Sequence, residues 1–240
     1  MTPKASIRGI EKAQSAPPLS VGVIASPLEL RCALRMRRPP HLFELRLDAL
    51  SEHLDEVQRV AASLPAPLII TARDPREGGL HQLSPRQRCD LLLRFMSFAT
   101  YVDVELQSVR MLRSVLEHAE SIDVRRIISV HNFDATPKLS TLMQLIDSAK
   151  TVGADILKVA TRTETVDELA RLLEFFDRAS EHLPVSAMGI GKLARHSRRL
   201  LARRGSVLNY AYLRSAEVEG QMSLAALRRT MARSPSPASK

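Results

Sequence analysis

The chain alternates between short apolar runs and longer amphipathic segments along almost its whole length. Eight runs have the length and the β-branched content of buried strands: residues 21–26, 42–47, 68–73, 101–106, 126–131, 155–160, 184–188 and 207–212. Between them apolar residues recur at intervals of three and four, most clearly over residues 86–98, 139–150, 165–179 and 192–201. This alternation predicts an α/β fold built on a parallel sheet.

The number of repeats favours one closed architecture over the open one. Eight strands with eight helical stretches, the last after residue 222, are the count of a single (β/α)8 TIM barrel. A doubly wound open sheet is the alternative, but it usually has a glycine-rich phosphate loop after its first strand. Here the first strand is followed by Ser-Pro-Leu-Glu, beginning at Ser26. We predict a barrel over residues 19–232, with disordered polar tails at 1–18 and 233–240.

Composition excludes several classes of protein. No stretch of about 18 apolar residues occurs, which excludes a membrane-spanning helix. The N-terminus lacks the apolar core of a secretory signal. The two cysteines, Cys32 and Cys89, are too few for a disulfide framework or a cysteine-rich zinc site. We therefore expect a cytoplasmic protein.

The net charge of +9 comes from 35 Lys and Arg against 26 Asp and Glu, and arginine dominates the basic residues. Basic runs at 35–38 and 195–204 resemble nucleic-acid patches. However, aromatic residues make up only 4%, which leaves few platforms for base stacking. We favour ordinary solvated helix faces and expect no nucleic-acid partner. Electrostatic steering of an anionic small substrate is compatible with the same charge.

Polar side chains interrupt the C-terminal halves of several predicted strands, where a buried parallel strand should be almost wholly apolar. Alternation places Glu44, Arg46 and Asp48 on one face of the second strand. Strands three to six add the polar residues Arg73, Asp103, Glu105, His131 and Lys158. The C-terminal strand ends form the mouth of a barrel, where active sites lie, and unpaired buried charge is costly. The pattern therefore predicts a polar site at that mouth.

Each of these residues also has a purely structural interpretation. Glu44 and Arg46 could form an ion pair, and His131 could be a hydrogen-bonded core histidine. Lys158 is harder to explain in this way, because it lies inside an apolar strand of a chain with little lysine. Burial and the arginines expected around it would both favour a neutral, nucleophilic amine. Lys158 is therefore a candidate for Schiff-base chemistry.

Taken in order, the polar segments resemble type I 3-dehydroquinate dehydratase of the shikimate pathway over roughly residues 20 to 230. The segments that carry the resemblance are Glu44-Leu-Arg46-Leu-Asp48, residues 71–79, 102–106, 129–137, 153–160 and 188–192, then Ser197-Arg198, Gly205-Ser206 and Gly220-Gln221. Each is weak by itself. Their order, with Lys158 following His131 by 27 positions, makes the set specific.

The resemblance implies a lyase that removes water from 3-dehydroquinate to give 3-dehydroshikimate. It implies that Lys158 forms an imine with the C3 ketone, whose iminium is an electron sink. His131 would take the proton from C2 and then protonate the departing C1 hydroxyl. Glu77 would orient His131 and tune its basicity.

The resemblance also implies the substrate contacts. Arg198 would pair with the substrate carboxylate through its guanidinium fork. Other residues would contact the hydroxyl and carbonyl groups; they are Ser26, Glu44, Arg46, Arg73 and Gln221. No metal and no organic cofactor is expected, because the lysine supplies the electrophile. The resemblance further suggests a homodimer.

The sequence departs from the family in the loop after the last strand. The family's Ser-Ala-Pro-Gly-Gln reads Glu217-Val-Glu-Gly-Gln221 here. A carboxylate at Glu217 would repel the substrate carboxylate unless it turned outward or paired with an arginine, so Glu217 is a candidate substrate-loop residue. Two milder changes place Ile190 where a methionine is expected and Tyr210 where a phenylalanine is expected.

Two other functions on the same fold stay open from the sequence. One is a class I aldolase-like barrel that forms an imine with another keto substrate, such as a phosphorylated sugar held by amides of residues 189–191. The other is a substrate-binding pseudoenzyme, a non-catalytic protein whose altered loop no longer holds 3-dehydroquinate. Retention of both His131 and Lys158 argues against the second.

Overall fold

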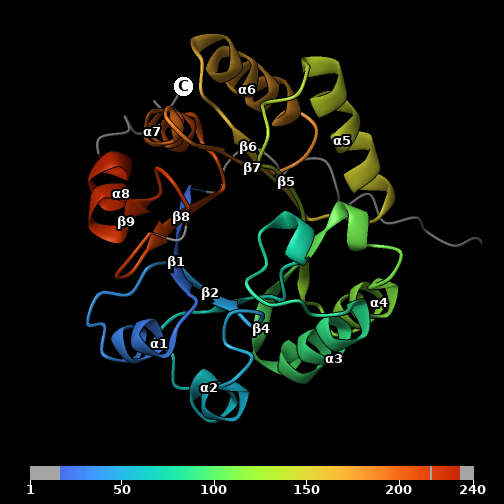
Figure 1. The fold of residues 1–240 in the computed structure, drawn as a ribbon, viewed down its shortest axis with the longest axis vertical. Helices are drawn as coiled ribbons and strands as arrows, with labels where there is room; N and C mark the ends of the chain where they lie inside the picture. The colour runs from blue at the N-terminus through green and yellow to red at the C-terminus, as the bar shows by residue number, and fades with distance from the viewer. Residues whose placement is uncertain (1–16, 217, 233–240) are drawn as a thin grey trace, which may run out of the picture.

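The computed structural model describes residues 17–216 and 218–232, and within them the strands form a barrel surrounded by helices (Figure 1). The strands are β1 (Leu19–Ile24), β2 (Leu42–Arg46), β3 (Leu68–Thr71), β4 (Ala99–Glu105), β5 (Arg125–Asn132), β6 (Ile156–Arg162), β7 (Val185–Ile190), β8 (Leu208–Tyr212) and β9 (Met222–Ser223). The helices are α1 (Pro27–Leu34), α2 (Leu54–Ala61), α3 (Pro85–Phe95), α4 (Arg113–Ser121), α5 (Leu139–Thr151), α6 (Val166–Ala179), α7 (Ala194–Arg204) and α8 (Leu224–Met231), with short 3-10 turns η1 (Pro75–Glu77), η2 (Met96–Phe98) and η3 (Leu106–Ser108).

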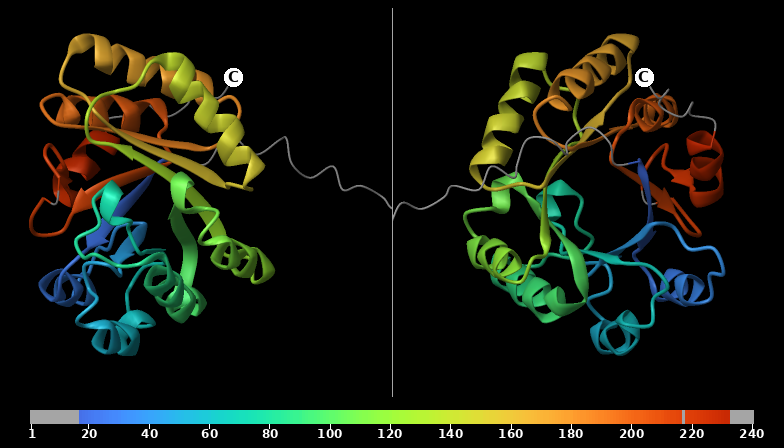
Figure 2. Two further views of the ribbon diagram at one scale, coloured as in Figure 1. Left: turned by 45° about the vertical axis from the view of Figure 1, so that its right-hand side comes forward. Right: turned by 180° about the vertical axis from the view of Figure 1, so that it is seen from behind.

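The predicted α/β barrel is confirmed. All strand pairs are parallel, in the order β7-β6-β5-β4-β3-β2-β1-β8-β9. Seen from behind in Figure 2, the strands surround the centre and the helices lie outside them. Of the predicted tails at 1–18 and 233–240, residues 1–16 and 233–240 lie outside the described residues, whereas Pro17 and Pro18 lead directly into β1.

The barrel closes between β7 and β8 without a continuous backbone ladder among the described residues. Instead, the Val207 N–H donates to the Val185 carbonyl at 3.0 Å. The Ser186 hydroxyl donates to the Leu208 carbonyl at 2.6 Å. A third bond runs from the Ala187 N–H to Ser206 Oγ. Serine hydroxyls thus satisfy backbone groups that a regular ladder would have paired.

Two separate cores follow from the alternation along the strands. Outward-facing side chains such as Phe43, Leu45 and Ile70 are fully buried against the helices. Inward-facing side chains such as Val21 and Ile127 fill the barrel interior. Towards the C-terminal ends of the strands, the inward positions become polar. This change of side-chain character places the site at one end of the barrel.

Local signals fix where the longer helices begin and end. Ser84 with Gln87 forms a capping box at the start of α3, and Thr165 with Glu168 does the same for α6. Gly205 ends α7 in a left-handed conformation with φ of 100°. These helices were predicted within a few residues of their observed bounds.

Two details differ from the sequence-based expectation. β1 ends at Ile24, so Ser26 does not end the strand but caps α1, accepting a hydrogen bond from the Glu29 N–H. The proline that follows Ser26 explains this, because proline favours the first turn of a helix. β9 was not predicted, because two residues are too short to show a pattern; it pairs with the end of β8 at Ala211 and Tyr212.

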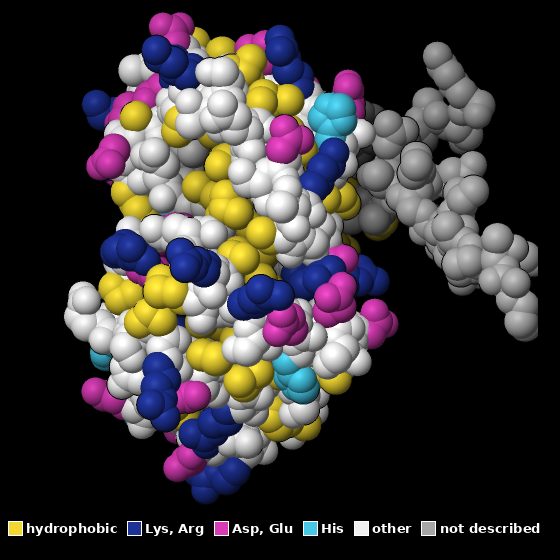
Figure 3. Space-filling model, turned by 90° about the vertical axis from the view of Figure 1, so that its right-hand side faces the viewer, with side chains coloured by type: hydrophobic (Ala, Val, Ile, Leu, Met, Phe, Trp, Pro, Cys, Tyr) yellow, Lys and Arg dark blue, Asp and Glu magenta, His cyan; other side chains and the backbone are white. Residues whose placement is uncertain are grey.

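Within the described residues, no helix has both the length and the apolar character needed to cross a membrane. Figure 3 shows the face over α3, α4 and α5, where basic and acidic side chains are interspersed. That face is therefore not a continuous basic patch of the kind that binds nucleic acid.

Candidate active site

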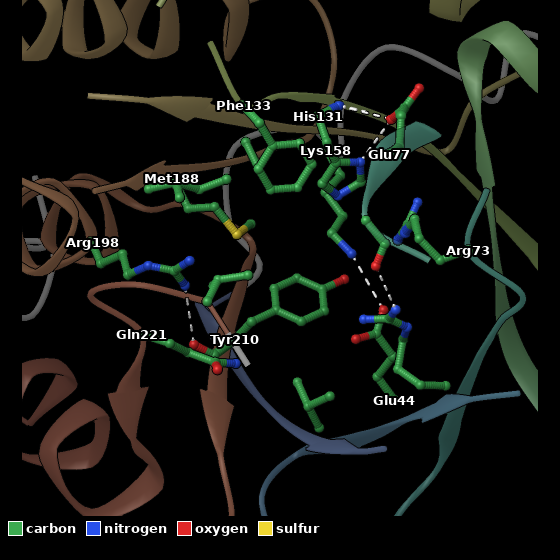
Figure 4. A pocket seen from close by; sticks show the side chains of 16 residues that line it. Glu44, Arg73, Glu77, His131, Phe133, Lys158, Met188, Arg198, Tyr210 and Gln221 are labelled. Atoms are coloured by element: carbon green, nitrogen blue, oxygen red, sulfur yellow. Dashed lines mark hydrogen bonds and ion pairs between the residues drawn. The ribbon is translucent and has the colours of Figure 1, made fainter. Parts of the chain in front are cut away.

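A cavity opens at the C-terminal end of the barrel, and most of the predicted site residues line it (Figure 4). The predicted residues that line it are Glu44, Arg46, Arg73, Glu77, His131, Lys158, Arg198 and Gln221. They come from six different strands or the segments that follow them. Apolar walls are added by Phe133, Met188, Ile190 and Tyr210. An apolar cavity with a few converging polar groups is the usual form of a small-molecule site.

Lys158 projects into this cavity from the middle of β6, with a side chain only 5% exposed. Its Nζ lies 2.8 Å from Asp103 Oδ2 and 3.3 Å from Glu44 Oε1. It also lies 4.0 Å from the centre of the Tyr210 ring, a cation–π contact. Three of the predicted arginines line the same cavity, but the direct partners of the amine are carboxylates. Burial explains this, since a buried ammonium needs opposite charge nearby.

Asp103 connects Lys158 to Arg73. The Arg73 guanidinium donates to both Asp103 oxygens at 3.0 Å and to Glu105 Oε1 at 3.0 Å. The Ser129 hydroxyl accepts from Arg73 at 2.7 Å and donates to Asp103 at 2.6 Å. Arg73 and Lys158 together hold the pKa of the Asp103 carboxyl well below its usual range, against the effect of burial. Arg73 therefore fixes the position of the Asp103 carboxylate, and that carboxylate in turn fixes the Lys158 amine.

A second arginine supports this network from outside the barrel. Arg88 of α3 is fully buried and donates to the Ala72 carbonyl at 2.7 Å and to Asp74 at 2.8 Å. It also pairs with Glu105. Each arginine is matched by carboxylates, so the charges are buried as pairs rather than singly. The result is a rigid base beneath the cavity.

His131 and Glu77 form a hydrogen-bonded pair at the rim. His131 Nδ1 and the His131 backbone N–H each lie 2.8 Å from Glu77 Oε2. The imidazole also stacks on Phe133 at 6.5 Å between ring centres. In the β5–β6 register Ser129 lies opposite Lys158 and His131 opposite Ala160, so His131 is one inward position closer to the mouth.

Burial changes the acid–base properties of this pair. It lowers the pKa of His131 well below its usual range, with Arg73 and Lys158 acting in the same direction. It raises the pKa of the Glu77 carboxyl to about 7, with the negative charge of Glu105 adding to the effect and Arg73 opposing it. The imidazole is thus neutral at neutral pH. Because Glu77 contacts Nδ1 of the imidazole, the other ring nitrogen, Nε2, is the one available to a ligand in the cavity.

Arg198 of α7 lies across the cavity from Glu77 and Arg73 in Figure 4. Its guanidinium donates to two backbone carbonyls, those of Gly189 at 3.2 Å and Tyr210 at 3.4 Å. No carboxylate pairs with it among the described residues. Burial lowers the pKa of Arg198 to about 10, so it stays charged at neutral pH. A buried cation held by carbonyls suits an anionic ligand.

Three further predicted residues line the cavity with their own partners. Arg46 pairs with Asp48, which lies 2.8 Å away, and donates to the Gly78 carbonyl at 3.1 Å. Glu44 accepts from the Thr71 hydroxyl at 2.9 Å. Gln221 lines the cavity from the segment between β8 and β9, where its N–H donates to the Val218 carbonyl at 3.2 Å.

Two predicted residues are not placed in the cavity. Ser26 is absent from its lining; its hydroxyl donates to Glu29 at 3.2 Å and caps α1 instead. The hydroxyl is thus used by the helix that begins beside it. Glu217 lies outside the described residues.

Sequence reasoning missed three contributors. Asp103 was recognised as polar but not as the partner of Lys158. Tyr210 was treated as a mild replacement, yet its ring contacts the Lys158 amine. Phe133 stacks on His131. Alternation along β4 puts Asp103 on the inward face, and this was the signal available for it. Among the described residues, no group of three or more His, Cys, Asp or Glu could hold a metal ion.

Comparison with known proteins shows the family of the chain. Residues 30–234 match the family model described as type I 3-dehydroquinase. A 3-dehydroquinate dehydratase of Methanococcoides burtonii is 28% identical over 224 residues, which cover 91% of this chain and 94% of that protein. The 3-dehydroquinate dehydratase of Desulfotalea psychrophila is 30% identical over 225 residues, which cover 90% of this chain and 97% of that protein.

Solved structures show the same fold. The 3-dehydroquinate dehydratase of Geobacillus kaustophilus superposes with a TM-score of 0.81 at 24% identity, covering 90% of each chain. The type I enzyme of Clostridium difficile, solved with covalently modified comenic acid, also gives 0.81, at 23% identity over 91% of this chain and 92% of that one.

Proposed function

The chain belongs to the type I 3-dehydroquinase family, and on that premise we propose that it dehydrates 3-dehydroquinate through an imine on Lys158. The observation that carries the proposal is that three functional side chains converge on one cavity. The buried Lys158 amine, the neutral His131 and the buried Arg198 line one cavity at the mouth of the barrel (Figure 4). A nucleophile, a base and a carboxylate anchor are the three groups that this elimination needs.

The first step is condensation of Lys158 with the C3 ketone. The amine nitrogen forms a bond to the carbonyl carbon, and the carbonyl oxygen leaves as water. Asp103 and Glu44 hold the nitrogen in place beforehand at 2.8 Å and 3.3 Å. They also balance the positive charge of the iminium that replaces the ammonium. The protein thereby supplies the electrophile itself, and we propose that no cofactor takes part.

The second step is proton transfer by His131. Its neutral Nε2 removes the proton from C2, and the electron pair moves into the iminium to give an enamine. The imidazolium then protonates the C1 hydroxyl, which departs as water. Glu77 stabilises the transient imidazolium through Nδ1, 2.8 Å away. Hydrolysis of the product imine returns the water lost in its formation and frees Lys158.

Arg198 anchors the substrate carboxylate. Arg46, Glu44 and Gln221 remain our candidates for the hydroxyl contacts, since they line the same cavity. Arg73 is a positioning residue, because its guanidinium is occupied by Asp103, Glu105 and Ser129.

The aldolase-like alternative is less well supported. It needs free amides near residues 189–191 to hold a phosphate. The Gly189 N–H already donates to Ser197 Oγ at 3.0 Å, and the Gly189 carbonyl accepts from Arg198. A pseudoenzyme is also disfavoured, because the His131–Glu77 pair and the Lys158 amine open into one cavity.

Borohydride reduction in the presence of 3-dehydroquinate tests the proposal. We expect a covalent adduct on Lys158 by mass spectrometry, and none on Lys158→Ala. The exposed Lys150→Ala variant is the matched control and should trap normally. His131→Ala should lose nearly all turnover while still forming the adduct. An active enzyme with an unmodified Lys158 would overturn the mechanism.

We also propose that the enzyme is a cytoplasmic homodimer, as the family resemblance implies. Light scattering of the purified protein would check the dimer, since a monomer at micromolar concentration contradicts it.

A further inference from the structure

The Tyr210 hydroxyl is buried without a hydrogen-bond partner, and it is the one such side-chain atom among the described residues. Tyr210 is 5% exposed. Tyr101, also inside the barrel, accepts a hydrogen bond from Arg125 at 2.9 Å. A buried hydroxyl without a partner disfavours folding, so its presence calls for an explanation. Phenylalanine would fill the same space without this cost.

The position of the ring indicates where the missing partner lies. The Tyr210 ring centre is 4.0 Å from Lys158 Nζ. In Figure 4 the hydroxyl is directed towards the side of the cavity that holds the Lys158 amine. Both oxygens of the neighbouring Asp103 already have donors, which come from Arg73, Ser129 and Lys158. Glu44 accepts from Thr71 and Lys158, both at Oε1.

The hydroxyl is a donor rather than an anion. Burial raises the pKa of Tyr210 well above its usual range, and the negative charges of Glu44 and Asp103 act in the same direction. The phenol therefore keeps its proton at any pH at which the enzyme would work. A ligand oxygen close to the Lys158 nitrogen would complete its hydrogen bonding.

We propose that the Tyr210 hydroxyl donates a hydrogen bond to the substrate oxygen on the carbon that Lys158 attacks, and so acts as a further catalytic residue in imine formation. This inference rests on the proposed function. In Figure 4 the Tyr210 ring and the His131–Glu77 pair lie on different sides of the Lys158 amine, so Tyr210 would add a donor separate from the proton-transfer pair.

The hydrogen bond would act while charge develops on that oxygen. As the C–N bond forms, the π electrons of the carbonyl move onto the oxygen, and a donor there stabilises them. The oxygen then leaves as water. Counted from the ammonium form of Lys158, both hydrogens of that water come from the nitrogen, which retains one hydrogen in the iminium. Tyr210 thus keeps its own proton throughout.

Tyr210→Phe tests the inference, since it removes the hydroxyl and keeps the ring over Lys158. The readouts are kcat/KM and the single-turnover rate of borohydride-trapped adduct at saturating 3-dehydroquinate. We expect both to fall by ~10-fold or more. Without substrate, the variant should be at least as stable as the wild type, because the deleted hydroxyl has no partner to lose. The matched control is Tyr212→Phe, the same deletion on the same strand, which should leave both rates unchanged.

The outcomes separate this inference from the mechanism beneath it. If wild-type Lys158 is not trapped at all, the proposed function fails. If wild type and Tyr210→Phe are trapped at the same rate, only the role of Tyr210 is overturned. A higher KM with an unchanged trapping rate also overturns it, because the hydroxyl would then bind a substrate oxygen away from the attacked carbon.

Discussion

At the scale of single residues, Asp103 is the side chain on which the site most depends. It joins Lys158 to Arg73, and none of its side chain is exposed. Without the Asp103 carboxylate, Arg73 keeps only Glu105 and Lys158 keeps only Glu44. Breaking a buried ion pair by changing one partner is more costly than losing the whole pair. The position of the nucleophile is therefore tied to the stability of the barrel.

Asp103→Asn should lower the free energy of unfolding by about 3–5 kcal/mol, because it breaks the buried pairs with Arg73 and Lys158 by changing only one partner. Urea denaturation measures this. Asp55→Asn is the matched control, since Asp55 pairs with Arg94 but is 89% exposed, and a surface pair is worth about 0–1 kcal/mol. Equal losses in the two variants would contradict the role given to Asp103.

Glu77, rather than His131, should set the acid side of the pH profile. Below pH 7 a protonated Glu77 donates to Nδ1 and forces the imidazole proton onto Nε2, which then cannot act as a base. Ionised Glu77 accepts from Nδ1–H and frees Nε2. As burial raises the pKa of Glu77 to about 7, kcat/KM should rise with pH through that value.

Glu77→Gln should abolish this inflection and lower the plateau, as measured from the pH dependence of kcat/KM. The same shift links pH to stability. The pKa of Glu77 in the folded protein lies above the ordinary value of 4.5, so folding favours the protonated acid. The free energy of unfolding should therefore decrease as the pH rises from 4.5 to about 7. Denaturation at pH 5 and 8 should show that the glutamine variant lacks this fall. An inflection that persists near pH 7 in the variant would assign it to another group.

At the scale of elements, helix α1 uses the predicted site residue Ser26 as its N-terminal cap. The Ser26 hydroxyl accepts from the Glu29 N–H and donates to the Glu29 carboxylate, which forms a closed cap. Such a cap contributes about 1 kcal/mol. A hydroxyl used in this way need not contact the substrate.

Ser26→Ala should therefore cost about 1 kcal/mol of stability and change KM by less than about 2-fold. Thermal unfolding and steady-state kinetics are the two measurements. Ser84→Ala, which removes the cap of α3, should give a similar loss of stability and no kinetic effect. A 10-fold rise in KM for Ser26→Ala alone would return Ser26 to the substrate site.

The elements themselves were predictable where a period was long enough to be visible. The inward face of β5 and β6 could be inferred from alternation, and so His131 and Lys158 could be placed on adjacent strands. The same reasoning identified Arg73 but not its role, because alternation gives the face of a side chain and not its partner. The partner depends on register, here Ser129 opposite Lys158, which a single sequence does not show. The two-residue β9 had no period at all.

At the scale of the whole molecule, the positive charge and the anionic substrate belong to one argument. Of the functions considered for the +9 charge, steering of a carboxylate substrate fits a site with the cation Arg198 buried in it. Helix N-termini follow the C-terminal ends of the strands, so they surround the mouth and add positive potential there. The attraction acts over long distances and is screened by salt.

We therefore expect kcat/KM to fall severalfold between about 0.01 M and 0.15 M salt, where the screening length shortens from about 30 Å to about 8 Å. Lys192 follows β7 at the mouth and is 78% exposed, so Lys192→Gln should lower kcat/KM at low salt and flatten its salt dependence. Lys150 lies in the last turn of α5, at the opposite end of the barrel, and Lys150→Gln removes the same charge far from the mouth. If both variants respond alike, net charge rather than its position governs the encounter. If kcat/KM does not respond to salt, the steering explanation for the charge fails.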